Sequence, residues 1–250
     1  MSNLFDKYPK KRPPLPSKIA SIYTDHYRLN RNGKTFASRL SKKMESWLHR
    51  QVAEEIPIDD QSNSATLELG AGTLNQLDYE KGWKTYDIVE PFRRLYMESI
   101  NLNYIDNVYC HIDEVPPESQ YCRIISVAVL EHICELPYVI AKCGLLLTKN
   151  GIFCAAIPNE GSLIWKLCWQ MTTGIEFRIR YGQRYSSLMA HEHVNTANEI
   201  DMVLRYFYSR VRCNVYGISK TLSIYRKYIC MNPDRKKCEE YLSMFARVRE

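Results

Sequence analysis

Residues Thr66 to Gln76 read Thr-Leu-Glu-Leu-Gly-Ala-Gly-Thr-Leu-Asn-Gln. A short apolar run, Ala65 to Leu69, arrives at two glycines one residue apart, Gly70 and Gly72, and helix-like spacing resumes after them. This order predicts a strand, a tight turn and the start of a helix. Glycine suits such a turn because it tolerates positive φ and lets a ligand approach the backbone, and the exposed N–H groups of the new helix favour negative groups.

Two carboxylates frame this unit. Glu68 lies two residues before Gly70, at the expected carboxyl end of the first strand, and Glu90 ends a second apolar run, Tyr86 to Val89. One βα unit of about 20 residues separates the two acids, and an acid that ends the second strand is placed to accept the two hydroxyls of a ribose. We therefore expect a ligand that carries a nucleoside.

The charge of Glu68 distinguishes between nucleoside cofactors. In a nicotinamide-dinucleotide site the pyrophosphate lies on this turn, where a carboxylate would repel it, whereas the ammonium group of a methionine would be attracted. The acid therefore favours S-adenosylmethionine. Here the sequence resembles the class I S-adenosylmethionine-dependent methyltransferases, whose first motif, acid-x-Gly-x-Gly, is matched by Glu68 to Gly72. Many members have a third glycine where this chain has Leu74, so the loop departs from the family pattern at that residue.

The resemblance also implies contacts to the adenine. Family members commonly have an acid after the third strand that accepts the exocyclic amine of adenine, with an apolar neighbour against the ring face, and Asp113 and Ile112 match this pattern. A solvated loop acid is the alternative for Asp113. We also expect Tyr23 or Tyr27 to touch the cofactor, with packing at the domain edge as the alternative. The implied cofactor site comprises Glu68, Gly70, Ala71, Gly72, Glu90, Pro91, Ile112, Asp113 and Val129.

A nearly continuous β-rich run, Arg123 to Val129, leads into Leu-Glu-His-Ile at Leu130 to Ile133. Such a run is typical of a central parallel strand that is buried on both faces, and ligands lie at the carboxyl ends of such strands. The phrase Val-Leu-Glu-His-Ile is very common here in the small-molecule, type 11/12-like branch of the family. The proline- and aromatic-rich motif of the nucleic-acid amino-methyltransferases is absent. His132 is therefore either a pocket residue or a helix-start residue packed against Glu131.

The whole chain predicts an α/β fold, a doubly wound Rossmann-like seven-stranded sheet, mostly parallel with an antiparallel last strand, plus an N-terminal helical segment and a lid insertion. Strands are expected at 65–69, 86–89, 108–111, 123–129 and 152–157, and the resemblance adds an antiparallel pair at 211–217 and 222–231. Helices are expected at 36–52, 91–101, 136–147, 197–207 and 234–250. The expected organisation is an arm and cap helix at 1–57, a methyltransferase domain at 58–233 and a C-terminal helix at 234–250. The basic, proline-rich stretch Lys7 to Lys18 is expected to be an extended, solvated arm.

The acceptor site is expected where the chain leaves the fifth strand. Glu160 follows this strand, and an insertion, 161–200, begins there; we interpret it as a lid, with a dimer face or an interfacial membrane contact as alternatives. A hydroxyl nucleophile needs a base near neutral pH, and the candidate bases are His132, His191 and His193. Substrate contacts are expected from Glu160, Tyr185 and Glu192. The His-x-His pattern offers no evident third ligand, so no metal is expected.

Composition limits the functional classes. The formal net charge of +6 is only mildly basic, which slightly favours an anionic or phosphate-bearing acceptor and gives no clear sign of nucleic-acid binding. No run approaches the ~20 apolar residues of a membrane span, and the polar start Met1 to Arg12 has no signal-peptide core, so we expect a cytoplasmic protein. The nine cysteines include no Cys-x-x-Cys pair and are interpreted as reduced packing residues. The oligomeric state is left open.

The predicted function is transfer of a methyl group from S-adenosylmethionine to oxygen or nitrogen of a small molecule. A sugar, or its lipid- or nucleotide-linked form, is the leading acceptor class, because segments 23–33 and 191–200 look like those of bacterial-type members found with surface-polysaccharide synthesis. Two alternatives stay open. One is a non-catalytic S-adenosylmethionine-binding partner subunit, whose pocket would look the same. The other is a nicotinamide-dependent reductase, which Glu68 opposes.

Overall fold

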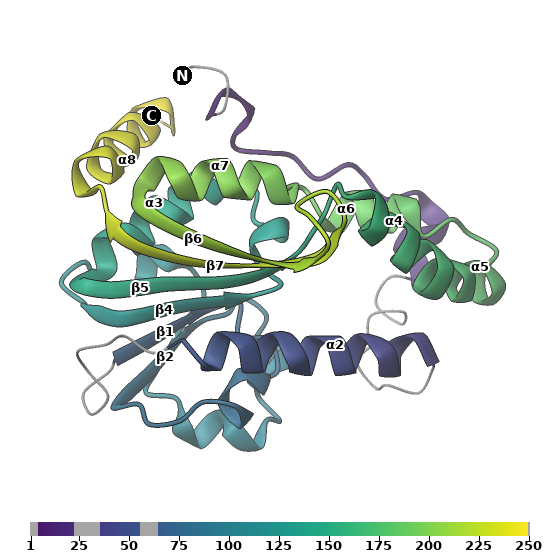
Figure 1. Cartoon of the computed structure of the whole chain (residues 1–250), viewed down its shortest axis with the longest axis horizontal. Helices are drawn as coiled ribbons and strands as arrows, with labels where there is room; N and C mark the ends of the chain where they lie inside the picture. The colour runs from purple at the N-terminus through teal and green to yellow at the C-terminus, as the bar shows by residue number, and fades with distance from the viewer. Residues whose placement is uncertain (1–4, 23–35, 56–64, 250) are drawn as a thin grey trace.

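The computed structural model describes residues 5–22, 36–55 and 65–249, and Figure 1 shows a central sheet between layers of helices. The strands are β1 (Ala65–Leu69), β2 (Thr85–Val89), β3 (Asn107–Tyr109), β4 (Tyr121–Val127), β5 (Leu147–Pro158), β6 (Tyr208–Gly217) and β7 (Ser223–Pro233). They lie in the order β3-β2-β1-β4-β5-β7-β6, and β7 runs antiparallel to both of its neighbours. The predicted doubly wound sheet with an antiparallel last strand is confirmed. Tyr23 and Tyr27, the residues expected to touch the cofactor, lie outside the described ranges.

Helices cover both faces of the sheet. One face carries α3 (Leu136–Leu146) and α7 (Ala197–Phe207), with α8 (Arg235–Arg249) packed beside α3, and the other face carries α2 (Phe36–Ala53) (Figure 1). Side chains of β4 alternate between them, so that Ile124 packs in the core under α3 and α7 and Ile125 in the core under α2. Both isoleucines are fully buried, which explains the continuous apolar run of this strand. Burial of each contributes about 2 kcal/mol to stability.

The loop after β1 does not continue as an α-helix, contrary to the sequence prediction. Leu74 adopts a left-handed conformation (φ 64°) that an α-helix does not accommodate, and a single 3-10 turn, Asn75–Asp78, follows it. The Leu74 side chain is fully buried, and this burial offsets the backbone strain. Leu74 stands where many members of the family that the sequence resembles have glycine. The backbone therefore keeps a shape that glycine adopts freely, although the residue is a leucine.

Residues 91–101 were also predicted to form a helix. The structure has two short 3-10 turns in this region instead, Arg93–Leu95 and Ile100–Tyr104. Most apolar side chains of the segment face solvent, with Phe92 67% and Ile100 86% exposed, whereas Tyr96 is buried. A short helix without a buried apolar stripe has too little tertiary packing to stabilise it. The helix prediction was wrong here for that reason.

The insertion after β5 is helical. It forms α4 (Leu163–Trp169), a π-helical turn (Gln170–Gly174), α5 (Ile175–Tyr181) and α6 (Ser186–Glu192), which lie beyond the carboxyl end of β5 (Figure 1). Ser162 caps α4, because its hydroxyl accepts a hydrogen bond from the Trp165 N–H at 3.1 Å. Among the helices of the described ranges, none combines the length and apolar character that crossing a membrane requires.

The N-terminal arm is docked against the domain, contrary to the expectation of a solvated leader. The ammonium group of Lys10 lies 2.8 Å from the Glu199 carboxylate. The guanidinium of Arg12 donates to the carbonyl of His132 at 2.8 Å. Prolines at Pro9 and Pro13 flank these contacts and favour an extended backbone there. The arm therefore contacts the loops that follow β4 and α6 and stabilises their positions.

Candidate cofactor and acceptor site

The glycine turn after β1 is closely packed. Gly70 has φ 68° and its N–H donates to the Val89 carbonyl at 2.8 Å. A methyl group added at Gly70 would lie 2.4 Å from Cγ2 of Val129, so a larger residue does not fit there. Val129 follows β4 and touches the turn, as the sequence predicts for two neighbouring strand ends. The loops after β1 and β4 thus meet at one edge of the sheet.

Glu90 is held rigidly at the same edge. Its side chain is buried, and its two oxygens accept hydrogen bonds from the Gly72 N–H at 2.8 Å and from the Phe92 N–H at 2.9 Å. Each carboxylate oxygen keeps a further lone pair, so the group is still able to accept hydroxyl protons from a ligand. Backbone donors fix its orientation before any ligand arrives, and this orientation requires the tight turn at Gly72 (φ 54°). Pro91, beside it, is exposed.

Glu68 is enclosed between the sheet and α2. It is 2% exposed, and its Oε2 accepts a hydrogen bond from the Tyr86 hydroxyl at 2.8 Å. Burial raises the pKa of Glu68 to about 7. The sequence argument from the negative charge of Glu68 therefore applies only to the ionised fraction of this side chain at neutral pH.

Asp113 and Ile112, the residues expected at the adenine, have partners within the domain. The Asp113 carboxylate accepts a hydrogen bond from the Tyr138 hydroxyl and lies 3.1 Å from the ammonium group of Lys142, both on α3. Ile112 is buried in the core on that side of the sheet. Asp113 is nonetheless half exposed, so its contact with adenine stays a prediction.

Polar side chains from three separate segments converge beyond β4 and β5. Glu131 and His132 belong to the 3-10 turn after β4, Glu160 follows β5, and His193 ends α6. The Glu160 carboxylate accepts from Nδ1 of His193 at 2.8 Å and from Nε1 of Trp165 at 2.5 Å. The rings of His132 and His193 lie 4.8 Å apart and nearly perpendicular. His132 lies in a short helical turn with its Nε2 3.8 Å from Glu131, as one interpretation expects, and it also faces His193, so its role as a pocket residue stays a prediction.

Asn195 holds these segments together, a role that no sequence pattern indicated. Its side chain is fully buried and donates to the carbonyl groups of Leu130 and Ile133 at 2.9 and 2.7 Å. Its backbone N–H donates to the Glu131 carbonyl at 3.0 Å. A buried amide with this many partners fixes the loop after α6 against the loop after β4. A lone asparagine in an irregular stretch carries no pattern from which this could be predicted.

The two carboxylates of the cluster differ in charge. Burial raises the pKa of Glu131 to about 7, and its Oε2 is one of the buried atoms without a hydrogen-bond partner in the described part of the chain. Burial would also raise the pKa of Glu160, but the hydrogen bond and charge of His193 outweigh it, so that pKa is lowered. Glu160 is therefore the ionised partner that orients His193. A histidine held through Nδ1 in this way offers Nε2 as a proton acceptor.

His191 and Tyr185 have contacts on other sides, with the N-terminal arm and with α5, so their predicted roles at the acceptor stay predictions. Nδ1 of His191 donates to the Pro13 carbonyl at 2.7 Å, on the side of the N-terminal arm. Residues two apart at a helix end point in different directions, which separates His191 from His193. The Tyr185 ring packs against Phe177 at 5.2 Å, and burial raises its pKa to about 12.

Glu192 does join the cluster. Its carbonyl accepts a hydrogen bond from Nδ1 of His132 at 2.8 Å, and its carboxylate lies 3.5 Å from the same nitrogen. Its predicted contact with an acceptor substrate stays a prediction.

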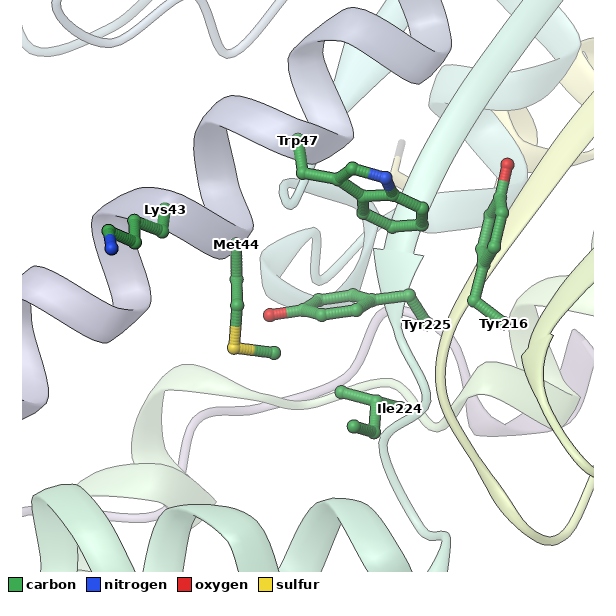
Figure 2. Close-up of a pocket in the computed structure, with 6 residues that line it drawn as sticks. All are labelled: Lys43, Met44, Trp47, Tyr216, Ile224 and Tyr225. Carbon is green, nitrogen blue, oxygen red and sulfur yellow. The ribbon is translucent and has the colours of Figure 1, made fainter.

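An aromatic hollow opens beside the cluster, and sequence analysis did not foresee it. Figure 2 shows Trp47 over the Tyr225 ring, with Tyr216 and Ile224 completing the wall. The hollow has a volume of about 300 Å³ and is lined by Lys43, Met44, Trp47, Tyr216, Ile224 and Tyr225. Tyr225 also packs against Trp165 at 5.5 Å, and Trp165 donates to Glu160. The hollow and the cluster are therefore joined through Trp165.

Comparisons with known proteins identify the fold. No protein-family model matches the chain, and no curated protein matches it. A possible histamine N-methyltransferase from Thermotoga maritima, described as S-adenosylmethionine-dependent, matches 86% of this chain and 97% of its own, with a TM-score of 0.55 and 11% identity. The plantazolicin methyltransferase BpumL was solved in complex with a desmethylPZN analogue and S-adenosylhomocysteine. Its alignment covers 85% of this chain and 93% of that protein, with a TM-score of 0.52 and 12% identity.

The CurJ carbon methyltransferase matches 86% of this chain, with a TM-score of 0.53 and 13% identity. The chain spans 61% of the length of that protein. At such identities the likeness concerns the fold alone. The chain has the Rossmann-like fold of the class I S-adenosylmethionine-dependent methyltransferases.

Proposed function

We propose that this protein transfers a methyl group from S-adenosylmethionine to oxygen or nitrogen of a small molecule. One observation carries the proposal: a turn that admits only glycine at Gly70 and a carboxylate fixed by backbone donors at Glu90 lie at the same sheet edge as an oriented Glu160–His193 dyad. Val129 connects the two halves, because it touches Gly70 and stands two residues before Glu131. A nucleoside cofactor and an acceptor would meet there.

The cofactor would lie along the turn from Gly70 to Gly72. Gly70 leaves no room for a side chain because Val129 packs against it, which sets the shape of the turn, and the second lone pairs of the Glu90 carboxylate would accept the ribose hydroxyls. S-adenosylmethionine supplies an electrophilic methyl group on a sulfonium. The main task of the protein residues is alignment of the acceptor with that methyl group, because the reaction is an in-line displacement.

His193 is the proposed base. Its Nδ1–H is bound to Glu160, so Nε2 takes the proton of an acceptor hydroxyl or amine, and the ionised carboxylate stabilises the imidazolium that forms. His132, 4.8 Å from it ring to ring, is the second residue that we assign to the acceptor side. His191 has no part in this proposal, because it contacts the N-terminal arm.

The acceptor class that we propose is a sugar, free or linked to a lipid or nucleotide. The aromatic hollow supports a substrate with a flat or ring-shaped face, since Trp47 and Tyr225 offer ring surfaces on which such a group stacks. Lys43 at its rim would favour an anionic substituent.

The test is release of S-adenosylhomocysteine by the purified full-length chain, supplied with S-adenosylmethionine and small-molecule extracts. We expect one extract fraction to support turnover in the wild type and in His191→Ala, and not in His193→Ala. Binding of S-adenosylmethionine with no turnover in any fraction would favour the non-catalytic partner subunit. Preferential binding of NADH would favour a reductase.

A further inference from the structure

Three side chains of the cluster offer metal-ligand atoms that lie close together. Glu131, His132 and His193 each offer a ligand atom, and these atoms all lie within 4.8 Å of one another. The sequence predicts no metal because it provides no third ligand for His191 and His193. The structure provides a different trio, in which His132 and Glu131 take the place of His191.

Both histidines are held in the tautomer that a metal requires. Nδ1 of His132 faces the Glu192 carbonyl at 2.8 Å and Nδ1 of His193 faces the Glu160 carboxylate at 2.8 Å. A carbonyl and an ionised carboxylate only accept hydrogen bonds, so both Nδ1 atoms carry the proton and both Nε2 atoms present a lone pair. A carbonyl or carboxylate behind each imidazole is the usual outer support of metal-binding histidines.

The buried carboxylate of Glu131 supplies a second, independent observation. This side chain is 1% exposed, and its Oε2 has no hydrogen-bond partner among the described residues. Its other oxygen lies 3.8 Å from Nε2 of His132, so the carboxylate faces the histidine lone pairs. A buried carboxylate without a partner is costly, and a bound cation would remove that cost.

We propose that Glu131, His132 and His193 bind one divalent first-row transition metal, with Zn²⁺ and Mn²⁺ as the leading ions. Two imidazole nitrogens and one carboxylate suit these ions, whereas Mg²⁺ prefers an all-oxygen shell. Metal–ligand bonds of 2.0–2.2 Å place ligand atoms about 3.3 Å apart, so binding draws the three side chains together by about 1 Å.

Three protein ligands leave a coordination position open, which is where an acceptor oxygen would bind. A metal-bound hydroxyl loses its proton to solvent more easily than a free one, and with Nε2 of His193 bound to the metal this takes the place of His193 acting as the base. This catalytic role rests on the proposed methyl transfer, whereas metal binding itself does not. Under this proposal Glu160 supports His193 from behind, and the aromatic hollow seats the rest of the acceptor.

The experiment is titration of the untagged, chelator-treated full-length chain with ZnCl₂ and MnCl₂ by calorimetry, and with CoCl₂ by visible absorption. We expect one ion per chain. Glu131→Gln and His132→Ala should each weaken binding at least 100-fold, and Glu160→Gln should weaken it about 10-fold as an outer support. His191→Ala is the matched control, because it removes the neighbouring histidine without touching the cluster, and it should bind as the wild type does. Circular dichroism confirms that each variant is folded.

No stoichiometric binding by the wild type would overturn the proposal, as would equal losses in His132→Ala and His191→Ala. Methyl transfer is then assayed with and without a chelator. Metal binding without any turnover would keep the metal site and contradict the proposed methyl transfer. Turnover that a chelator leaves unchanged would contradict the catalytic role of the metal.

Discussion

Two buried polar clusters lie on this sheet, and they differ in how far their charges are paired. Under α2, Arg123 pairs with Glu80, Tyr86 donates to Glu68, and the His49 ring bonds to Gln76 at 2.7 Å. At the carboxyl edge, one oxygen of Glu131 has no hydrogen-bond partner within residues 5–22, 36–55 and 65–249, and the His132 side chain is 31% exposed. A network whose charged members each have an internal partner stabilises the fold. A network in which one oxygen of a buried carboxylate lacks a partner, beside two partly buried imidazoles, is arranged for a ligand.

The largest expected difference is in activity. Glu160→Gln should lower methyl transfer by about 10²- to 10⁴-fold, because His193 loses the charge that orients and supports it. The unfolding free energy should change by less than about 1 kcal/mol, since glutamine still accepts a hydrogen bond from the ring. S-adenosylhomocysteine release and urea unfolding measure the two effects. Wild-type turnover in this variant would mean that the cluster around Glu160 and His193 has a structural role, like the network under α2.

Substitutions in the network under α2 should lower the stability of the fold, in contrast to Glu160→Gln, which should lower activity. Arg123→Met leaves Glu80 charged and buried, which we expect to cost about 3–5 kcal/mol of unfolding free energy. The double variant Arg123→Met, Glu80→Met should recover most of that loss, because neither charge is then left alone. Denaturant unfolding of both variants is the measurement. A loss below about 1 kcal/mol in the single variant would mean that this pair is not part of the fold's stability.

Because of Glu68, the free energy of unfolding is expected to depend on pH. Its pKa is about 7 in the folded chain and 4.5 when unperturbed, so between these values the folded protein holds a proton that the unfolded chain releases. The stabilisation is therefore full below about pH 4.5 and is lost as the pH rises through 7, by up to about 3 kcal/mol. Glu68→Gln should remove about half of this dependence, because Glu131, whose pKa is also raised to about 7, contributes a similar slope; urea unfolding from pH 5 to pH 8 is the measurement. The same slope in both proteins would contradict it.

The smallest expected effect is on the affinity for S-adenosylmethionine at the proposed cofactor site. Glu90→Ala should weaken binding of S-adenosylmethionine by about 1–3 kcal/mol, because the ribose hydroxyls lose a charged acceptor and the turn loses the partner of the Gly72 N–H. Calorimetry with the folded variant measures this. Phe92→Ala serves as a control, since its backbone N–H is kept and its exposed side chain is removed. Equal losses in both variants would indicate disturbance of the loop instead of a lost acceptor.

Sequence patterns predicted the sheet because each strand carries its own signal. The apolar runs that end at Leu69 and Val127 are buried on both faces, and such runs are recognised without knowledge of their neighbours. The helices predicted after Gly72 and at 91–101 did not form: Leu74 in the left-handed region prevents the first although its side chain is buried, and the second leaves Phe92 and Ile100 exposed. Local spacing cannot report whether a core exists for a helix to pack on.

The site was predicted in part for a related reason. His132, Glu160 and His193 were found because they follow strands or lie in the insertion at the ligand edge, but their partners could not be found. Asn195 bonds to residues more than 60 positions earlier, and Trp47 meets Tyr216 from the far end of the chain. Such contacts are set by tertiary packing. The separation of His191 from His193 likewise depends on where α6 ends.

Calorimetric titration of the full-length chain with S-adenosylmethionine tests the central claim most directly. We predict one site per chain, tighter binding than for NADH, and loss of binding in Gly70→Val, whose side chain would occupy the space against Val129. Gly182→Ala is the control, because Gly182 also has a positive φ (63°) but has open space around it and lies in the insertion. Unchanged affinity in a folded Gly70→Val variant, or tighter binding of NADH by the wild type, would contradict the account.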